Sequence, residues 1–287
     1  MIQDKLLMGA HVSIAGGFDK AIERGEKIGA TCIQIFTKSN RQWGAKKITS
    51  DDVDAFLDAQ KKSSIKMVVA HASYLINLCS DNNAIIRKSI DALIEELQRC
   101  EQLDIPYLVL HPGTSSNPDT QKVLITVADH INQAFKEVKP KNTTLLLETM
   151  AGQGSTIGKT VEELAVILDH VHDKKHIGVC IDTCHIFAAG YDLSTKKFYD
   201  DFWNKISKLI GIKNVKAFHI NDSKKDFDSH VDRHEHVGKG KINPVVFKML
   251  LKDKRFSKIP KILETPKEDE FKDDVRNLKT LRDYFNS

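Results

Sequence analysis

The sequence predicts an α/β protein that folds as a single (β/α)8 TIM barrel over residues 1–287. Eight short apolar or β-branched runs alternate with longer amphipathic segments along the whole chain. Strands that alternate with helices pair in parallel through right-handed crossovers. The length of 287 residues suits one closed barrel, which takes about 250 residues. No Gly/Ser/Pro-rich linker or shift in composition divides the chain, so we expect one domain.

The eight expected strands are short and rich in branched apolar residues, as strands in parallel sheets are. The first four cover 6–13 (LLMGAHVS), 31–37 (TCIQIFT), 66–73 (KMVVAHAS) and 107–113 (YLVLHPG). The last four cover 144–150 (TLLLETM), 177–185 (IGVCIDTCH), 215–222 (VKAFHIND) and 261–266 (KILETP).

The segments between the strands have helical periodicity. In 81–103, apolar residues recur at a spacing of 3.6, at positions 85, 86, 90, 93, 94 and 97. The segment 160–170 begins with Thr160 followed three residues later by Glu163, which predicts a capping box. An open doubly wound sheet is the alternative architecture, but its usual GxGxxG first turn is absent, since this chain has Ala15-Gly16-Gly17. The barrel is therefore the preferred fold.

The composition is that of an ordinary globular protein. The chain has 43 Lys and Arg against 39 Asp and Glu, a net charge of +4, with 41% hydrophobic residues. The 15 Gly and 7 Pro are too few for collagen-like or low-complexity architecture. A charge of +4 neither indicates nor excludes a nucleic-acid partner.

The N-terminal segment and the cysteines favour a cytoplasmic protein. Residues 1–9 contain both an acid and a base and lack the apolar run of a signal peptide. No apolar stretch approaches the ~20 residues that span a bilayer. The five cysteines are odd in number and form no CxxC, so we expect reduced, buried thiols, with zinc ligation as the alternative for Cys180 and Cys184.

Metal-ligand residues occur at the ends of six consecutive expected strands. They are His71, His111, Glu148, Asp182 with His185, His219 and Glu264. In a barrel these positions meet at the C-terminal mouth, where active sites of this fold lie. Converging carboxylates and imidazoles need a countercharge, and a His/Asp/Glu donor set suits Zn²⁺ or Mn²⁺ better than Mg²⁺.

A second polar cluster follows the seventh expected strand. It contains His230, Asp232, Arg233, His234 and His236. In an extended segment Asp232 and His234 face the same side, so together with His185 they would complete another metal shell. For His11, at the end of the first expected strand, a structural role is the preferred interpretation.

The ordered set of motifs resembles the endonuclease IV family of apurinic/apyrimidinic (AP) endonucleases along nearly the whole chain. The matching stretches are GAHVS at 9–13 with Gly16-Gly17, FTK at 36–38 with RQW at 41–43, HASYLINL at 71–78, HPG at 111–113, ETMAGQG at 148–154, CIDTCH at 180–185 with AAGYD at 188–192, HINDSK at 219–224, VDRH at 231–234 and LET at 263–265.

The resemblance implies a barrel that holds three zinc ions, with Mn²⁺ as an alternative at some sites. His71, His111 and Glu148 would hold one ion. Glu148 would bridge to a second, completed by Asp182, His219 and Glu264. His185, Asp232 and His234 would hold the third. Glu148 would also be the catalytic residue that orients the attacking water.

The resemblance further implies a monomeric DNA-repair enzyme. It would hydrolyse the phosphodiester 5′ to abasic sites in duplex DNA, leaving a 3′-hydroxyl and a 5′-deoxyribose phosphate, and would remove 3′-phosphate and 3′-phosphoglycolate blocks. Two loops would bend the DNA from the minor groove, and two further cations would contact phosphates. These expected DNA-binding residues are Arg41, Gln42 and Trp43 in one loop, Tyr74 and Leu75 in the other, and Lys224 and Arg233.

Two other functions compete with this one. Sugar isomerases and epimerases of the xylose-isomerase-like barrel type also place His/Glu/Asp metal sites at strand ends, but they need only one or two metals. A non-catalytic lesion-binding protein with structural zinc would favour closed, Cys-rich sites. An isomerase or epimerase would not use the Asp232/His234 pair or the two loops, and the expected ligand set is rich in carboxylates with shared ligands rather than in cysteine.

Overall fold

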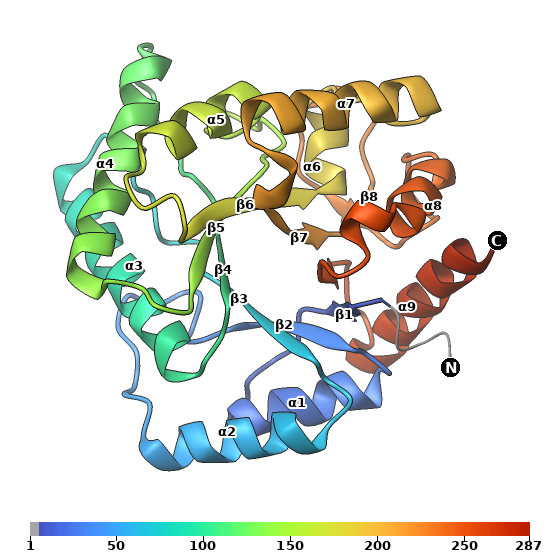
Figure 1. Cartoon of the computed structure of the whole chain (residues 1–287), viewed down its shortest axis with the longest axis horizontal. Coiled ribbons are helices and arrows are strands. Elements are labelled where there is room, and N and C mark those ends of the chain that lie inside the picture. Colours follow the sequence, from blue (N-terminus) through green and yellow to red (C-terminus); the bar gives the residue numbers. More distant parts are fainter. Residues whose placement is uncertain (1–5) are drawn as a thin grey trace.

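The computed structural model describes residues 6–287 and contains eight parallel strands surrounded by helices (Figure 1). The eight strands are β1 (Met8–Ala10), β2 (Cys32–Phe36), β3 (Met67–His71), β4 (Tyr107–Leu110), β5 (Thr144–Glu148), β6 (Ile177–Asp182), β7 (Val215–His219) and β10 (Lys261–Leu263). All eight lie within the expected runs and are shorter than those runs. Residues 1–5, with which the expected domain and N-terminal segment begin, lie outside the described residues.

The strands form one sheet in the order β1-β10-β7-β6-β5-β4-β3-β2, with every neighbouring pair parallel. The two ends of this order meet, because His11 bridges to Gln34 in parallel register. The backbone N–H of Val12 donates to the carbonyl of Gln34 at 2.8 Å. The sheet therefore closes on itself, and the predicted TIM barrel is confirmed.

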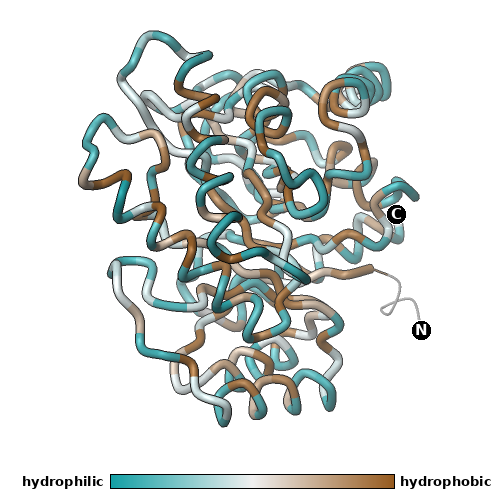
Figure 2. The backbone as a smooth tube through the Cα atoms, turned by 60° about the vertical axis from the view of Figure 1, so that its left-hand side comes forward, coloured by the Kyte–Doolittle hydropathy of each residue, from teal (hydrophilic) through white to brown (hydrophobic). Residues whose placement is uncertain are grey.

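The helices form a ring outside the sheet (Figure 1). They are α1 (Phe18–Lys27), α2 (Ser50–Lys62), α3 (Asn83–Gln102), α4 (Thr120–Val138), α5 (Val161–His170), α6 (Thr183–Ala188), α7 (Lys196–Leu209), α8 (Pro244–Lys252) and α9 (Glu270–Asn286), with 3-10 turns at Ile212–Asn214 and Lys254–Phe256. Hydrophobic and hydrophilic residues alternate along the helices (Figure 2), as expected when one face packs on a sheet. In residues 6–287, none of these helices combines the length and apolar composition that a bilayer crossing requires.

The helix expected over 81–103 is α3, confirmed to within two residues at its start. Asn82 caps it by accepting a hydrogen bond from Ala84 N at 2.8 Å. Ile90, Leu93 and Leu97 are buried on its inner face. The periodicity therefore identifies the packed face correctly.

The capping box expected at Thr160 is only half formed. Thr160 Oγ1 accepts from Glu163 N at 3.1 Å. The Glu163 carboxylate, however, accepts from the backbone N–H groups of Gly158 and Lys159, at 2.7 and 3.1 Å, rather than from Thr160. The Glu163 side chain thus binds the turn before the helix instead of completing the capping box.

Two expected strands end early, which corrects the prediction for His185. The run 177–185 leaves the sheet at Asp182, whose Oδ1 accepts from His185 N at 2.9 Å and caps α6. His185 is therefore on a helix, one turn beyond the strand end. The run 215–222 divides similarly: β7 ends at His219, and β8 (Asp222–Ser223) pairs antiparallel with β9 (His234–Glu235).

The barrel interior is filled by a small apolar layer. Val69, Val109, Leu146, Cys180 and Ala217, one from each of β3 to β7, form a buried cluster separate from the main core between sheet and helices. Side chains two residues further along a strand point to the same side. The next inward layer therefore consists of residues 71, 111, 148, 182 and 219.

Candidate metal centre

The mouth of the barrel gathers all nine predicted ligand residues. The inward layer above the apolar one consists of His71, His111, Glu148, Asp182 and His219. Glu264 stands in the same relation to the buried Ile262 of β10. His185 enters from α6, and Asp232 and His234 enter from the segment that contains β9.

These residues form three groups whose candidate ligand atoms lie within 4.8 Å of one another. The groups are His71, His111 and Glu148; Glu148, Asp182, His219 and Glu264; and His185, Asp232 and His234. Glu148 belongs to two groups. The structure thus brings together the sets that the resemblance implies.

Glu148 lies at the centre of the site and is fully buried. Its Oε2 is 3.3 Å from His71 Nε2 and 3.1 Å from His111 Nε2. Its Oε1 is 2.9 Å from His219 Nδ1 and 3.3 Å from His185 Nδ1. Burial raises the pKa of Glu148, but the surrounding imidazoles, His219 and His111 first, outweigh it and hold that pKa well below its usual range. This carboxylate is therefore ionised and available to a cation.

Main-chain carbonyls orient three of the imidazoles. His71, His185 and His234 donate from Nδ1 to the carbonyl oxygens of Ala72, Thr149 and Glu264, at 2.7, 2.7 and 3.0 Å. A neutral imidazole that donates from Nδ1 has its lone pair on Nε2. In each of the three residues Nε2 is the atom that faces a carboxylate of the centre. Such support is typical of metal-ligating histidines.

Gln34 orients His219 in the opposite sense. Gln34 Nε2 lies 2.6 Å from Glu264 Oε1, and an ionised carboxylate accepts only, so this atom is the amide nitrogen. Gln34 Oε1 therefore accepts from His219 Nε2, at 2.8 Å. In the neutral ring the lone pair of His219 then lies on Nδ1, which is 2.9 Å from Glu148 Oε1 and 3.2 Å from Glu264 Oε2. Burial lowers the pKa of His219, but Cys180, Glu264 and Glu148 outweigh it and hold that pKa well above its usual value. Nδ1 therefore faces a position that a proton occupies and that a metal ion could occupy in its place.

Two other imidazole nitrogens lack a hydrogen bond. His185 Nε2 and His234 Nε2 are buried and make no hydrogen bond within residues 6–287, although Asp232 oxygens lie 3.2 and 3.4 Å away. In the neutral rings these nitrogens carry lone pairs, so they and the Asp232 oxygens are all acceptors and no hydrogen bond forms between them. Buried nitrogens of this kind fit a metal ion, and the mixed imidazole and carboxylate set suits zinc.

The cysteines near the centre are buried thiols. Cys180 and Cys184 are both free and inaccessible. Cys184 is close enough to Asp182 and His234 to form a further candidate group, but burial raises the pKa of its thiol to about 12. Burial likewise raises the pKa of Cys180 to about 11, so both residues are protonated, buried thiols in this structure.

The two expected DNA-bending loops lie side by side at the mouth. Tyr74 is 55% exposed, and its ring lies 5.3 Å from that of His71 and 5.4 Å from that of His111. Leu75 and Trp43 are half-buried, whereas Arg41 and Gln42 are exposed.

A buried carboxylate joins the two loops from below. Glu96 of α3 accepts from Thr37 Oγ1 at 2.6 Å and from Ser73 N at 3.2 Å. Ser73 Oγ donates to the carbonyl of Asn40 at 2.9 Å. The loops are thus fixed relative to each other and to the centre.

The two other expected DNA contacts lie on the β8–β9 hairpin. Lys224 and Arg233 are both exposed. Lys224 Nζ lies 3.8 Å from Glu235, and the Arg233 guanidinium donates to the carbonyl of Asp232 at 2.5 Å. The backbone N–H of Lys224 donates to the carbonyl of Arg233 at 2.9 Å, so both cations lie on the hairpin that carries Asp232 and His234.

Three supporting residues are not predicted from the sequence. Gln34 is a polar residue inside the apolar run CIQIF, and that anomaly is the available sign of its role. Asn221 donates to Asp182 Oδ2 at 2.7 Å and accepts from Glu264 N at 2.8 Å. Asp222 accepts from the N–H groups of residues 223, 238, 240 and 242 and so holds the segment that carries Asp232. A Cβ at Gly240 would lie 2.4 Å from Asp222 Oδ1, so this turn requires glycine.

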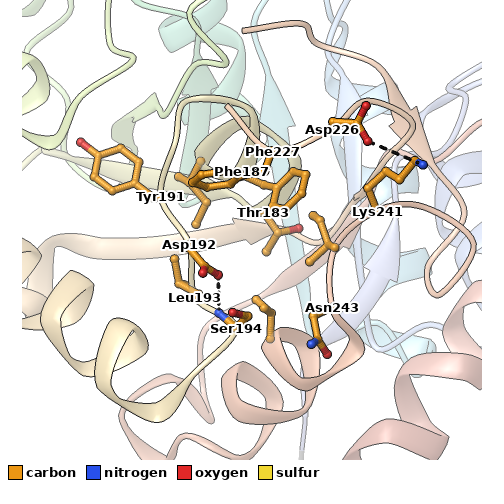
Figure 3. A pocket seen from close by; sticks show the side chains of 13 residues that line it. Thr183, Phe187, Tyr191, Asp192, Leu193, Ser194, Asp226, Phe227, Lys241 and Asn243 are labelled. Atoms are coloured by element: carbon orange, nitrogen blue, oxygen red, sulfur yellow. Dashed lines mark hydrogen bonds and ion pairs between the residues drawn. The ribbon is translucent and has the colours of Figure 1, made fainter. Parts of the chain in front are cut away.

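Two hollows flank the centre. A cleft of about 850 Å³, lined by His11, Phe36, Tyr74 and Glu264 among others, opens directly beside it. A second, largely apolar pocket of about 510 Å³ lies beyond α6, with the side chains of Phe187, Tyr191 and Leu193 around it (Figure 3). None of the nine candidate ligands lines this second pocket.

Comparison with known proteins agrees with the fold and the residue set. Residues 22–281 match the family described as xylose isomerase-like TIM barrels. The chain is 46% identical over 274 residues to the probable endonuclease 4 of Chloroflexus aurantiacus, covering 96% of both proteins. It is 42% identical over 276 residues to that of Geotalea daltonii, covering 96% of this chain and 97% of the relative.

Solved structures show the same relationship. The crystal structure of endonuclease IV from Thermus thermophilus aligns with a TM-score of 0.86 and 33% identity over 97% of this chain and 98% of that one. A D-tagatose 3-epimerase-like protein shares the fold alone, at a TM-score of 0.71, 20% identity and 97% coverage of both chains. The chain belongs to the endonuclease IV family of xylose isomerase-like TIM barrels.

Proposed function

We propose that this protein is a zinc-dependent AP endonuclease of DNA repair. It hydrolyses the phosphodiester 5′ to an abasic site in duplex DNA, leaving a 3′-hydroxyl and a 5′-deoxyribose phosphate. By the same chemistry it removes phosphate and phosphoglycolate from blocked 3′ ends. The relatives named endonuclease 4 and endonuclease IV support DNA cleavage as the class of reaction.

The observation that carries the proposal is the presence of three candidate ligand groups at one mouth, of which two share Glu148. Closely spaced zinc ions lower the pKa of water from about 15.7 towards about 7 and neutralise phosphate charge. Phosphodiester hydrolysis at neutral pH requires both effects. The third group, His185 with Asp232 and His234, lies on the side of the hairpin cations and would stabilise the departing 3′-oxygen.

The chain's own residues would position and restrain these parts. Glu148 spans two groups and would orient the attacking water with its ionised carboxylate. Gln34 and Asn221 hold Glu264 and Asp182 by hydrogen bonds, so these carboxylates keep their orientation when the substrate arrives. The net charge of +4 counts four carboxylates that would be committed to metal, and the positive field would therefore be focused at the mouth.

Selection of abasic sites would depend on the two loops joined by Glu96. Tyr74 and Leu75, with Arg41, Gln42 and Trp43 of the neighbouring loop, would bend the duplex and fill the space left in the base stack. An abasic nucleotide has no base to unpair, so its extrusion costs little. Since one chain supplies all nine ligands, we expect a monomer to be sufficient for activity.

A sugar isomerase or epimerase is the competing function, and the epimerases among similar structures share the fold alone. An isomerase would leave the third group and both loops without a role.

Incision of a duplex that contains one tetrahydrofuran abasic analogue tests the proposal. We expect incision at a single phosphodiester, with a 3′-hydroxyl on one fragment and a 5′-phosphate on the fragment that carries the analogue, whereas the matched intact duplex stays uncut. Isomerisation or epimerisation of a sugar by a preparation that leaves the abasic duplex intact would reject the nuclease in favour of its rival.

A further inference from the structure

The arrangement of the metal centre does not explain the position of His11. It follows β1, its ring packs against that of Phe36 with centroids 4.3 Å apart and the planes tilted by 52°, and its side chain is 17% exposed. It lines the 850 Å³ cleft together with Tyr74 and Glu264. His11 is not among the nine candidate ligands, although its Nδ1 lies only 3.7 Å from Glu264 Oε1.

The hydrogen bonds of Gln34 determine which nitrogen of His11 carries the proton. Gln34 Oε1 accepts from His219, and one amide N–H donates to Glu264. The second amide N–H points at His11 Nδ1, 3.0 Å away. That nitrogen must accept, so the neutral ring carries its proton on Nε2.

This leaves an N–H donor on the cleft side of the ring. Within residues 6–287, His11 Nε2 makes no protein hydrogen bond, whereas the residue's carbonyl accepts from Lys267 Nζ at 2.5 Å. The main chain of His11 is therefore fixed by Lys267, one ring nitrogen is fixed by Gln34, and the remaining donor has no partner.

The cleft provides a polar path towards the centre. Its two lysines are already paired, Lys38 with Glu95 at 2.5 Å and Lys267 with Asp274 at 2.7 Å. The cleft wall also includes the polar side chains of Ser13, Ser39 and Asn40 and the carboxylates of Glu264 and Glu268, so the donor on His11 is the group left open to a phosphate oxygen. Glu264 belongs to the four-residue candidate metal group. A phosphate that reaches this group from the cleft passes the Nε2 edge of His11.

We propose that His11 is a substrate-contacting residue that donates a hydrogen bond from Nε2 to a non-bridging oxygen of the scissile phosphate. The inference rests on the proposed nuclease function and adds a protein donor to it. A neutral, pre-oriented donor stabilises developing charge on phosphate oxygens without the cost of reorganisation.

Two substitutions separate this role from a structural one. An asparagine amide reaches the position of Nδ1 but not that of Nε2, so His11→Asn keeps an acceptor for Gln34 and removes the donor. A glutamine amide reaches the position of Nε2, so His11→Gln restores the donor. We expect His11→Asn to slow single-turnover incision of the abasic duplex about 100-fold, and His11→Gln to remain within about 10-fold of wild type. Both should retain the metal content and melting temperature of the wild type.

Binding provides a second readout. One diastereomer of a methylphosphonate at the scissile position replaces the oxygen that His11 contacts. On that duplex His11→Asn should bind as tightly as wild type, whereas on the phosphodiester duplex and the other diastereomer it should bind several-fold more weakly.

Each outcome has one interpretation. If wild type cleaves the abasic duplex and His11→Asn cleaves it equally fast, His11 is structural and the inference is wrong, while the proposed function stands. The same holds if the Asn variant binds all three duplexes with the same deficit or loses metal. If wild type does not cleave abasic DNA at all, the proposed function fails and the inference fails with it.

Discussion

Lys261 offers a quantitative test of the structure away from the metal centre. It begins β10, is fully buried, and donates from Nζ to the carbonyls of Phe256 and Ile259 at 2.6 and 2.8 Å. Burial lowers the pKa of Lys261 from 10.5 to about 8. A neutral amine has two N–H groups, which match the two carbonyls, so loss of the proton leaves this contact complete.

The sign of the pH dependence follows from these two pKa values. Between pH 8 and 10.5 the unfolded chain still carries a proton that the folded chain has released. Raising the pH therefore stabilises the fold, and lowering the pH through 8 removes this stability. At ~1.4 kcal/mol for each pH unit, the free energy of unfolding gains about 2.5 kcal/mol from this group between pH 7 and pH 10. In the folded chain Cys32, next to Lys261, does not titrate in this range because burial raises its pKa to about 12; in the unfolded chain it titrates in both proteins alike.

The assay is urea denaturation of wild type and Lys261→Met from pH 7 to pH 10. Groups common to both proteins cancel in the difference of unfolding free energies, which should rise by about 2.5 kcal/mol in favour of wild type. Lys254→Met, at an exposed lysine in the neighbouring 3-10 turn, is the matched control, and its difference from wild type should stay constant. A constant difference for Lys261→Met as well would refute the placement of a buried amine at this position.

The remaining predictions concern the centre and the loops. Glu148→Ala should lower incision of the abasic duplex by about 1,000-fold or more and leave duplex affinity within a few-fold, since Glu148 is fully buried and makes no surface contact; an equal loss of both would indicate a structural role. Tyr74→Ala should lower the ratio of affinities for abasic and intact duplex about tenfold, the scale of one lost stacking contact, without changing the salt dependence of binding, and an unaltered ratio would reject the wedge assignment. Glu96→Gln, which leaves either Thr37 Oγ1 or Ser73 N without its acceptor, should reduce the same ratio and cost ~1–3 kcal/mol of stability; full discrimination would show that the loops are independent. Brief EDTA treatment should leave activity intact, and prolonged dialysis against chelator should abolish it and lower the melting temperature, both reversed by Zn²⁺; insensitivity to prolonged chelation would contradict metal dependence.

The sequence predicts the parts of the fold that depend on local periodicity. Eight apolar runs and the helical spacing of residues 85–97 indicate the barrel, and strand-end polar residues such as His71 and Glu148 identify its mouth. Alternation along strands is a local rule, so the convergence of residues two positions beyond the inner apolar layer can be expected from the sequence.

The features that the sequence does not predict depend on contacts between distant segments or on a local cap. The apolar run predicts a strand as far as His185. In the structure the strand ends at Asp182, which caps a helix, so the imidazole of His185 lies one helical turn beyond the strand end. The role of Gln34 depends on partners 23, 185 and 230 residues away along the chain. The β8–β9 hairpin is only two residues long on each side and leaves no periodicity to detect.

The most direct test of the central claim measures metal content and incision on one preparation of purified wild type. We predict close to three ions per chain, mostly zinc, in a sample that cleaves the tetrahydrofuran duplex 5′ to the lesion. Fewer than two zinc or manganese ions per chain in a fully active sample would contradict the proposed three-metal mechanism.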